Sequence, residues 1–270
     1  MKEIPPLRSS ACRPHRRLCL AVDVEQYSRL DTRTQSAVQS ELVRMLDEAA
    51  AVAGLDRSAW IRQPQGDLEF AVLPEDTPED AVLGPLVHHL AVRLWDRNAR
   101  PAAQRVRLRM ALDTGVAVDA ALGHAGPAPV AVARYVNAPQ LRALLATLTA
   151  ADLAVIVSDR LYQDVVRAGW PDLDPAQYTR VHIRVKEFGG YGWVRVPGHA
   201  PDDVRSAVAE APEPKPEPEP SRDPGDPSRT PLSQHVNQGA AVGRDVVGGL
   251  TIGAVGLPVP PPSAGSGPTR

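Results

Sequence analysis

The sequence predicts an α+β domain followed by a long polar C-terminal segment. Apolar residues recur first at strand spacing and then at helical spacing, in alternation, over residues 16–196. Beyond residue 197 this pattern stops, and the chain's 28 prolines and 20 glycines crowd toward that end. With 270 residues, 43% of them hydrophobic, the chain can still bury a full core. We therefore expect one folded domain and a tail.

The first six predicted elements have the order strand, helix, strand, strand, helix, strand. In chain order they are a strand at 16–24, a helix at 32–52, strands at 59–62 and 68–73, a helix at 80–95 and a strand at 106–112. The first run is nearly continuously apolar, as in a strand buried on both faces, whereas the last alternates apolar residues with arginine. This βαββαβ order predicts a ferredoxin-like antiparallel sheet with helices on one face. In that topology the third strand inserts between the first and second, antiparallel to the first.

Further elements complete the predicted domain, which spans residues 15–197. They are a Gly/Pro loop at 123–129, a helix at 132–146, a strand at 153–157, a helix at 159–168 and a hairpin at 181–185 and 192–196. The full expectation is a βαββαβ unit extended by C-terminal αβαββ elements.

The tail divides into three predicted parts. Residues 198–235 form a Pro-rich linker, in which proline alternates with Glu or Lys over 212–220 and favours an extended, polyproline-like spacer. Residues 236–256 mix β-branched residues with glycine, carry little charge and have no proline, as in segments that stack between chains. Residues 257–270 are predicted to be a disordered tail.

Composition argues against several functional classes. A formal net charge of -2 gives no reason to expect nucleic-acid binding, which depends on basic patches. Cys12 and Cys19 are too few for a disulfide framework or a zinc site, and favour reduced thiols in a cytoplasmic protein, with Cys19 in the core. Asp23 interrupts the apolar run after five residues, too early for a membrane span, so we expect no membrane association.

Two aspartates occupy matching strand contexts. Asp23 ends the first apolar run, and Asp67 opens the run that follows Gly66. If those runs are antiparallel neighbours, the two carboxylates converge. Convergent carboxylates suit Mg²⁺ or Mn²⁺, which proteins often hold by one or two carboxylates together with substrate phosphates. The competing interpretation is that each aspartate merely caps a turn.

The ordered set of motifs in residues 15–197 resembles the class III nucleotidyl cyclases. The segments that carry the resemblance are LAVDVEQYS, QGDLEFAV, RLRMALDTG with its expected turn, the loop ending at Gly126 followed by Arg134, and HIRVKEFGGYGWVRV. The resemblance implies a homodimer that takes a nucleoside triphosphate between its protomers. It also implies that Asp23, Asp67 and the Val24 carbonyl hold two divalent ions, and that Arg134 stabilises the transition state.

The same resemblance assigns nucleotide binding to Gln63, Gly66, Gly126 and Lys186. Three departures follow from it: Gln63 replaces a base-reading lysine, Gly123 a base-selecting aspartate, and Val130 the ribose-positioning asparagine. Loss of one polar group aimed at developing charge costs on the order of 10²- to 10³-fold in rate. The resemblance therefore implies a nucleotidyl cyclase with an incomplete active site.

The sequence is compatible with three functions. The first is a signalling protein that binds metal-NTP and forms a cyclic nucleotide weakly. The second is a non-catalytic dimerising scaffold or effector-adaptor. The third is a cyclase of unusual base choice in phage defence, with Gln63 reading the base. The 236–256 segment is loosely similar to the amyloid signalling motifs of bacterial immune proteins and to the RHIM core, which implies a partner protein with a matching motif.

Overall fold

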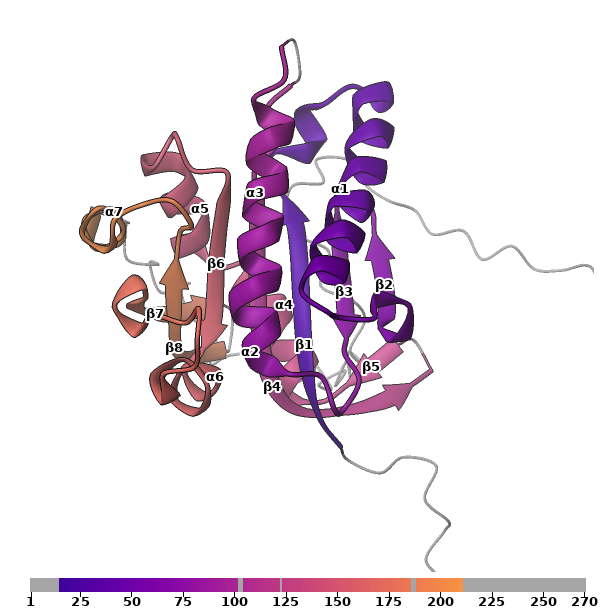
Figure 1. Cartoon of the computed structure of the whole chain (residues 1–270), viewed down its shortest axis with the longest axis vertical. Helices are drawn as coiled ribbons and strands as arrows, with labels where there is room; N and C mark the ends of the chain where they lie inside the picture. Colours follow the sequence, from indigo (N-terminus) through magenta and orange to yellow (C-terminus); the bar gives the residue numbers. More distant parts are fainter. Residues whose placement is uncertain (1–14, 102–103, 122, 186–187, 211–270) are drawn as a thin grey trace, which may run out of the picture.

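One mixed β-sheet organises the part of the chain that the computed structural model describes, residues 15–101, 104–121, 123–185 and 188–210 (Figure 1). The strand order is β2-β3-β1-β4-β6-β8-β7, with β5 pairing alongside β4. The strands are β1 (His15–Val24), β2 (Ile61–Gln65), β3 (Leu68–Val72), β4 (Leu108–Ala120), β5 (Gly123–Ala125), β6 (Leu153–Ser158), β7 (Thr179–Val185) and β8 (Phe188–Arg195).

The first half of the sheet has the predicted ferredoxin-like arrangement. Strand β3 lies between β1 and β2 and runs antiparallel to β1, with Cys19 opposite Val72 and Asp23 opposite Leu68. Strand β4 pairs with the other edge of β1, also antiparallel. The second half departs from a purely antiparallel sheet, because β4 and β6 are parallel. The α+β prediction is confirmed, with a mixed sheet.

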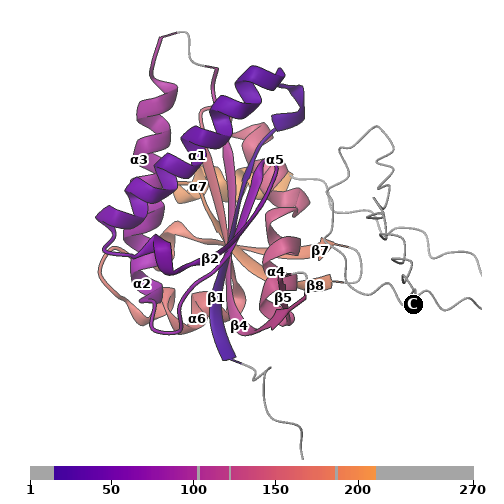
Figure 2. The same cartoon turned by 90° about the vertical axis from the view of Figure 1, so that its right-hand side faces the viewer.

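Helices cover both faces of this sheet (Figure 2). Helices α1 (Thr32–Val52), α3 (Val87–Asn98) and α6 (Asp159–Asp164) pack on one face, whereas α4 (Pro127–Val136), α5 (Pro139–Thr147) and α7 (Pro201–Glu210) pack on the other. The expectation of helices on one face therefore holds for α1, α3 and α6. Helices α4, α5 and α7 cover the face that a minimal ferredoxin-like unit would leave open.

Strand β1 contributes to two separate hydrophobic cores. Leu18, Leu20 and Val22 pack in the core beneath α1 and α3, and Cys19 and Ala21 in the core beneath α4 and α5. Successive side chains of a strand point to opposite faces, so a strand covered on both sides needs apolar residues at every position. This explains the apolar run from Leu18 to Val22.

Two predicted helices are interrupted by proline. The helix expected at 80–95 begins as α2 (Glu79–Ala81) and passes through one π-helical turn (Val82–Leu86) into α3. Pro85 lies in that turn and has no N–H for a regular helical hydrogen bond. The helix expected at 132–146 is divided into α4 and α5, because Pro139 suits the first turn of a new helix better than the interior of an old one.

Strand β4 runs further than predicted, and the turn expected at residues 113–115 is not a turn. Asp113, Thr114 and Gly115 continue the pairing with β1. Gly115 is required by packing, since a Cβ there would lie 3.3 Å from the Cβ of Ala128 on α4 and closer still to the Arg160 guanidinium. The motif therefore brings α4 close to the sheet.

Helix α7 lies in the segment where the linker was predicted to begin. Val204 and Ala207 are buried in the core beneath α5, so ordered structure extends to residue 210. The remainder of the predicted linker, the 236–256 segment, the terminal tail, Cys12 and Lys186 lie outside the described residues. Across the described part of the chain, no helix combines the length and apolarity needed to cross a membrane.

Candidate functional site

Asp23 and Asp67 converge at one end of β1. Asp23 pairs with Leu68, the residue after Asp67, and the Val24 N–H donates to the Asp67 carbonyl at 3.2 Å. Gly66 opens the two-residue turn between β2 and β3 with φ 68°, a left-handed conformation that glycine adopts without strain. The chain thus holds the second aspartate beside the first.

The Asp23 carboxylate is buried and already has a cationic partner. It forms an ion pair with Arg109, its direct neighbour across β4, and only 7% of the Asp23 residue is exposed. Burial raises the pKa of Asp23 to about 6, while the Arg109 charge opposes this rise and the Asp67 charge adds to it. The effect of Asp67 on Asp23 indicates that the two carboxylates share one electrostatic environment.

Arginine side chains supply the positive charge of this site. Within the described structure, the Nε and Nη1 groups of Arg109 are buried and have no hydrogen-bond partner. Arg142 on α5 also lowers the pKa of Asp23, and its Nη2 is 3.4 Å from the Asn137 Oδ1. The Asp23 carboxylate therefore contacts the Arg109 guanidinium, with Asp67 and Arg142 within electrostatic range, and Arg109 keeps N–H groups for which an anionic oxygen would be an acceptor.

The sequence missed both arginines for identifiable reasons. Arg109 belongs to the strand whose alternation predicted one exposed face, yet it is only 7% exposed because α4 and α5 cover that face. Arg142 belongs to no recognised motif, and its effect on Asp23 depends on a helix break at Pro139. A buried arginine paired with a strand-end aspartate can be identified from sequence only once the strand register is known.

The donor set suits a cation that arrives with its own oxygen ligands. Among the residues that the structure describes, no group of three or more His, Cys, Asp or Glu is placed to hold a metal ion. Asp23 and Asp67 supply two carboxylates, and Mg²⁺ commonly uses one or two of these plus substrate phosphates. The unpartnered Arg109 N–H groups fit the phosphate half of such a pair.

Two positions that the sequence linked to base recognition lie in contact. A Cβ at residue 123 would overlap the Gln63 amide, so Gly123, with φ 121°, provides the room in which Gln63 lies. The Gln63 Nε2 is 3.3 Å from the His124 Nδ1, and the His124 Nε2 is 3.2 Å from the Asp119 Oδ1. Gln63, His124 and Asp119 thus form a connected polar chain. His124 carried no sequence signal, because its partner lies 61 residues away.

Gly126 and Arg134 lie at opposite ends of α4. Gly126 precedes the helix with φ 128°, and a Cβ there would overlap the Val116 carbonyl oxygen. Arg134 is in the last turn, roughly 12 Å further along the axis at 1.5 Å per residue. Val130 lies between them and is 38% exposed. The structure therefore does not gather Gly126 and Arg134 at a single point.

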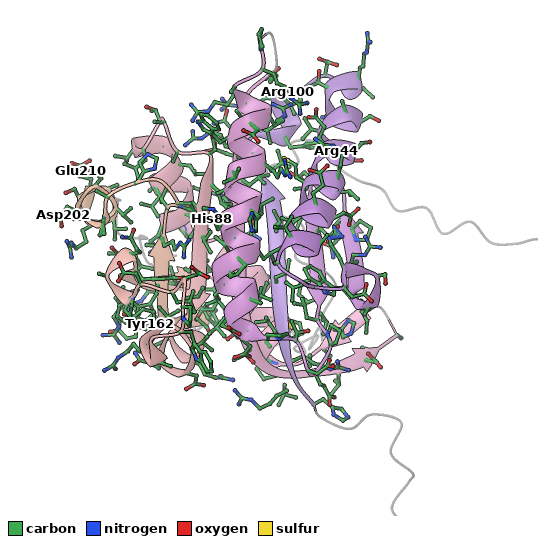
Figure 3. All side chains as sticks on the ribbon, in the orientation of Figure 1. Arg44, His88, Arg100, Tyr162, Asp202 and Glu210 are labelled. Carbon is green, nitrogen blue, oxygen red and sulfur yellow. The ribbon has the colours of Figure 1, made fainter. Side chains whose placement is uncertain are left out.

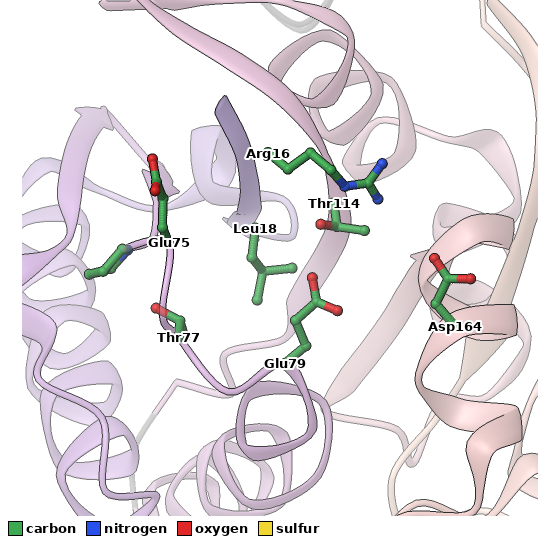
Figure 4. A pocket seen from close by; sticks show the side chains of 8 residues that line it. Arg16, Leu18, Glu75, Thr77, Glu79, Thr114 and Asp164 are labelled. Carbon is green, nitrogen blue, oxygen red and sulfur yellow. The ribbon is translucent and has the colours of Figure 1, made fainter. Parts of the chain in front are cut away.

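A polar cavity of about 240 Å³ lies near the start of β1, at the other end of the strand from Asp23 (Figure 4). Its lining includes Arg16, Leu18, Glu75, Glu79, Thr114 and Asp164. Glu75 is also an acceptor for His15, whose Nδ1 is 2.7 Å away. Three carboxylates and one guanidinium make this cavity a poor receptor for phosphate.

Comparison with known proteins gives structural neighbours but no close relatives. No family model matches the sequence, and no curated protein matches it. An adenylate/guanylate cyclase/hydrolase structure from Silicibacter pomeroyi is 21% identical, with a TM-score of 0.48, covering 69% of this chain and 99% of that chain. The adenylyl cyclase CyaB from P. aeruginosa is 13% identical, with a TM-score of 0.45, covering 69% and 97%.

A third neighbour is the guanylate cyclase domain of RhGC from Catenaria anguillulae in complex with GTP. It is 15% identical, with a TM-score of 0.44, covering 67% of this chain and 96% of that chain. At these TM-scores the structural similarity does not support a role for any individual residue. The candidate site is defined by the contacts within this structure.

Proposed function

We propose that this protein binds a nucleoside triphosphate with a divalent cation at the Asp23–Asp67 site, as a diverged class III cyclase-like domain in a cytoplasmic homodimer. The observation that carries the proposal is the strand register, which pairs Asp23 with Leu68 and brings the Asp67 carbonyl to the Val24 N–H, so that the two aspartates lie side by side. The ordered motifs of residues 15–197 support the same conclusion.

Each group of the site has a defined part in this proposal. Asp23 and Asp67, with the Val24 carbonyl, would hold Mg²⁺ or Mn²⁺, which when bound neutralises phosphate charge and polarises the reacting oxygens. Arg109 donates to the phosphates, because its guanidinium group contacts Asp23 and two of its nitrogens have no partner, and the Arg142 charge adds to the positive potential at Asp23. Their fixed positive charge favours a polyanionic ligand in a buried site.

Base recognition falls to Gln63 in this proposal. Its amide can both donate and accept, and its contact with His124 limits the orientations that it can adopt. Gly66 and Gly126 position the turn and the helix start that flank the nucleotide, and Lys186 and Arg134 supply further charge from the hairpin and from α4. A second protomer completes the site.

The test is incubation of the purified protein with each of the four NTPs and Mn²⁺, followed by detection of cyclic product and of metal-dependent nucleotide binding. We expect binding that is lost in Asp23→Ala and Asp67→Ala. Asp96→Ala is the matched control, because Asp96 is an exposed aspartate on α3, away from the site. Sedimentation velocity should give a dimer. Absence of binding with every NTP, in a folded wild-type protein, would refute the proposal.

A second candidate function is a non-catalytic scaffold, and the ion pair between Asp23 and Arg109 favours it. In that case the Arg109 guanidinium neutralises Asp23 in place of a metal ion, and Val130 provides no hydrogen bond to a ribose. The 236–256 segment then recruits a partner through amyloid-type stacking. Purified full-length protein should then seed thioflavin-positive fibres without nucleotide dependence. A protein that stays soluble at high concentration and forms no fibres would exclude this function.

A further inference from the structure

Strand β7 is the edge strand at one end of the sheet, and it exposes a row of basic side chains, here called the basic row, to solvent. Arg180, His182 and Arg184 are all exposed, whereas the residues between them, Val181 and Ile183, are buried. No described strand pairs with the outer edge of β7. Strand β7 lies on the left of Figure 1.

The polar backbone groups of the same three residues point away from β8. Val185 pairs with Phe188 across a two-residue connection, and the pair that closes such a hairpin exchanges hydrogen bonds. Because bonded and non-bonded pairs alternate, Arg180, His182 and Arg184 turn their N–H and C=O groups to the outer edge. The His182 carbonyl accepts from the Gln140 side chain on α5 at 2.7 Å, so an added strand would share or displace this hydrogen bond.

Aromatic contacts hold the basic row in place. The Arg180 guanidinium carbon lies 3.8 Å from the centroid of the Tyr191 ring, and the His182 ring lies 5.0 Å from it. Asp159 is the acidic group near this surface, with its Oδ1 4.0 Å from the Arg180 Nε and 2.8 Å from the Trp193 Nε1. One carboxylate among two arginines leaves the row with a positive charge.

The opposite edge of the sheet is built differently. Strand β2 contains Pro64, which cannot donate to a further strand. Strand β7 has no proline, so its charges are the main obstacle to pairing with another strand, although the His182 carbonyl already accepts from the Gln140 side chain. A strand with matching negative charge would meet no such obstacle.

The chain itself supplies such a segment directly after α7. Helix α7 contacts β7, and Glu210 at its end lies on the same side of the molecule (Figure 3). Residues 212–220 then read PEPKPEPEP, with non-proline residues at every second position. In an extended strand, alternate residues turn their N–H groups to the same edge, so this segment, if extended, would present all its N–H groups on one edge and all its prolines on the other.

We propose that residues 212–220 of the same chain add to the outer edge of β7 as a terminal strand. Glu213, Lys215 and Glu217 would lie directly opposite Arg180, His182 and Arg184. The Glu-Lys-Glu pattern meets the Arg-His-Arg pattern in either strand direction, which places both glutamates on arginines. The prolines face outward and end the sheet, since they cannot donate to another strand.

This arrangement has two consequences for the protein. It seals an edge that would otherwise be open to pairing with a second copy of the chain. It also fixes the point from which the 236–256 segment leaves the domain. Neither consequence depends on nucleotide binding.

Amide hydrogen exchange in the full-length chain tests the proposal at the outward-facing N–H groups of Arg180 and Arg184. We expect these amides to exchange roughly tenfold faster or more in E213K/E217K than in the wild type. The matched control is D223K/D226K, which reverses two charges beyond the segment and should exchange like the wild type. Adding R180E/R184E to E213K/E217K should restore slow exchange by reversing both sides of each pair.

Three outcomes would overturn the proposal. The first is equal exchange at both amides in the wild type and E213K/E217K. The second is equal acceleration in E213K/E217K and D223K/D226K, which would indicate a general charge effect. The third is protection that vanishes on dilution, which would assign the occupant to a second copy. Unchanged exchange at Leu20 and Ala21 in β1 verifies that each variant is folded.

Discussion

Two buried ion pairs on opposite faces of the sheet differ in how many carboxylates contact the arginine. Arg57 and Glu69 lie beneath α1, and the Arg57 Nη2 donates to both Glu69 oxygens at 2.8 Å. Asp47 adds a second carboxylate, 3.1 Å from the Arg57 Nη1, though without hydrogen-bond geometry. Asp23 and Arg109, on the other face, make a single contact.

The difference separates a structural pair from a candidate binding site. In the first pair one arginine is held between two carboxylates. Two nitrogens of each arginine have no hydrogen-bond partner, but Arg109 contacts one carboxylate alone, and Asp67 and Arg142 bring further charge of both signs. A buried arginine with one carboxylate partner can accept a further anion, whereas Arg57 already has two.

The largest expected effect is on the structural pair. Arg57→Met should lower the free energy of unfolding by about 3–5 kcal/mol, because it leaves the Glu69 carboxylate buried without its cation. Urea denaturation measures this change. Nucleotide binding by the folded fraction should be unchanged, and a selective loss of binding would contradict the comparison.

A smaller loss of stability is expected at the candidate site. Arg109→Met should cost about 2 kcal/mol, because Arg142 still supplies positive charge near Asp23. Nucleotide affinity should fall more than roughly tenfold, since both spare N–H donors are lost. Titration calorimetry measures the affinity, with Arg44→Met on the exposed face of α1 as the control. Equal stability losses in the Arg57 and Arg109 variants would contradict the distinction between a structural ion pair and a binding site.

A third buried carboxyl group has no bonded arginine. Burial raises the pKa of Asp113 above its usual value, although Arg160 and Arg16 oppose the rise. Because the folded-state pKa is raised, the stability is fully present below about pH 4 and declines as the pH rises through that pKa. Asp113→Asn should remove this decline and stabilise the protein by on the order of 1 kcal/mol at pH 7.

Thermal unfolding of wild type and Asp113→Asn between pH 3.5 and 7 tests this sign. The two midpoints should coincide at the acidic end and diverge as the pH increases. A wild type that gains stability relative to the variant over that range would show that Asp113 is stabilised as an anion.

The smallest effect concerns Cys19, which faces Asp113 across β1 and β4. Burial, together with the Asp113 charge, raises the pKa of this thiol to about 12. In a Cys12→Ser background, iodoacetamide should not label Cys19 at pH 8 until urea unfolds the chain, because the thiolate is the reactive form. Rapid labelling of the folded protein would show that the core beneath α4 opens.

Local sequence patterns predicted the order and placement of the first strands and helices. The apolar run at 16–24 indicated a strand covered on both faces, and the helical spacing from Thr32 to Val52 gave the bounds of α1. The element order then placed β3 beside β1, and with it Asp67 beside Asp23. These inferences succeeded because each depends on residues close together in the chain or on a common topology.

Long-range packing produced the features that the sequence did not predict. Arg109 alternates with apolar residues as an exposed residue would, but α4 and α5 bury it. The contact between Gln63 and His124 joins residues on different strands. Helix α7 buries two small apolar residues, Val204 and Ala207, too weak a pattern to distinguish it from a linker.

The central position of β1 has a consequence for biosynthesis. Its two partner strands, β3 at 68–72 and β4 at 108–120, are made long after it. In a growing chain whose β4 has not yet left the ribosome, one edge of β1 therefore has no partner strand. Pairing of both edges of β1 must wait for nearly a hundred further residues, so early translation is the interval in which chaperone protection matters most.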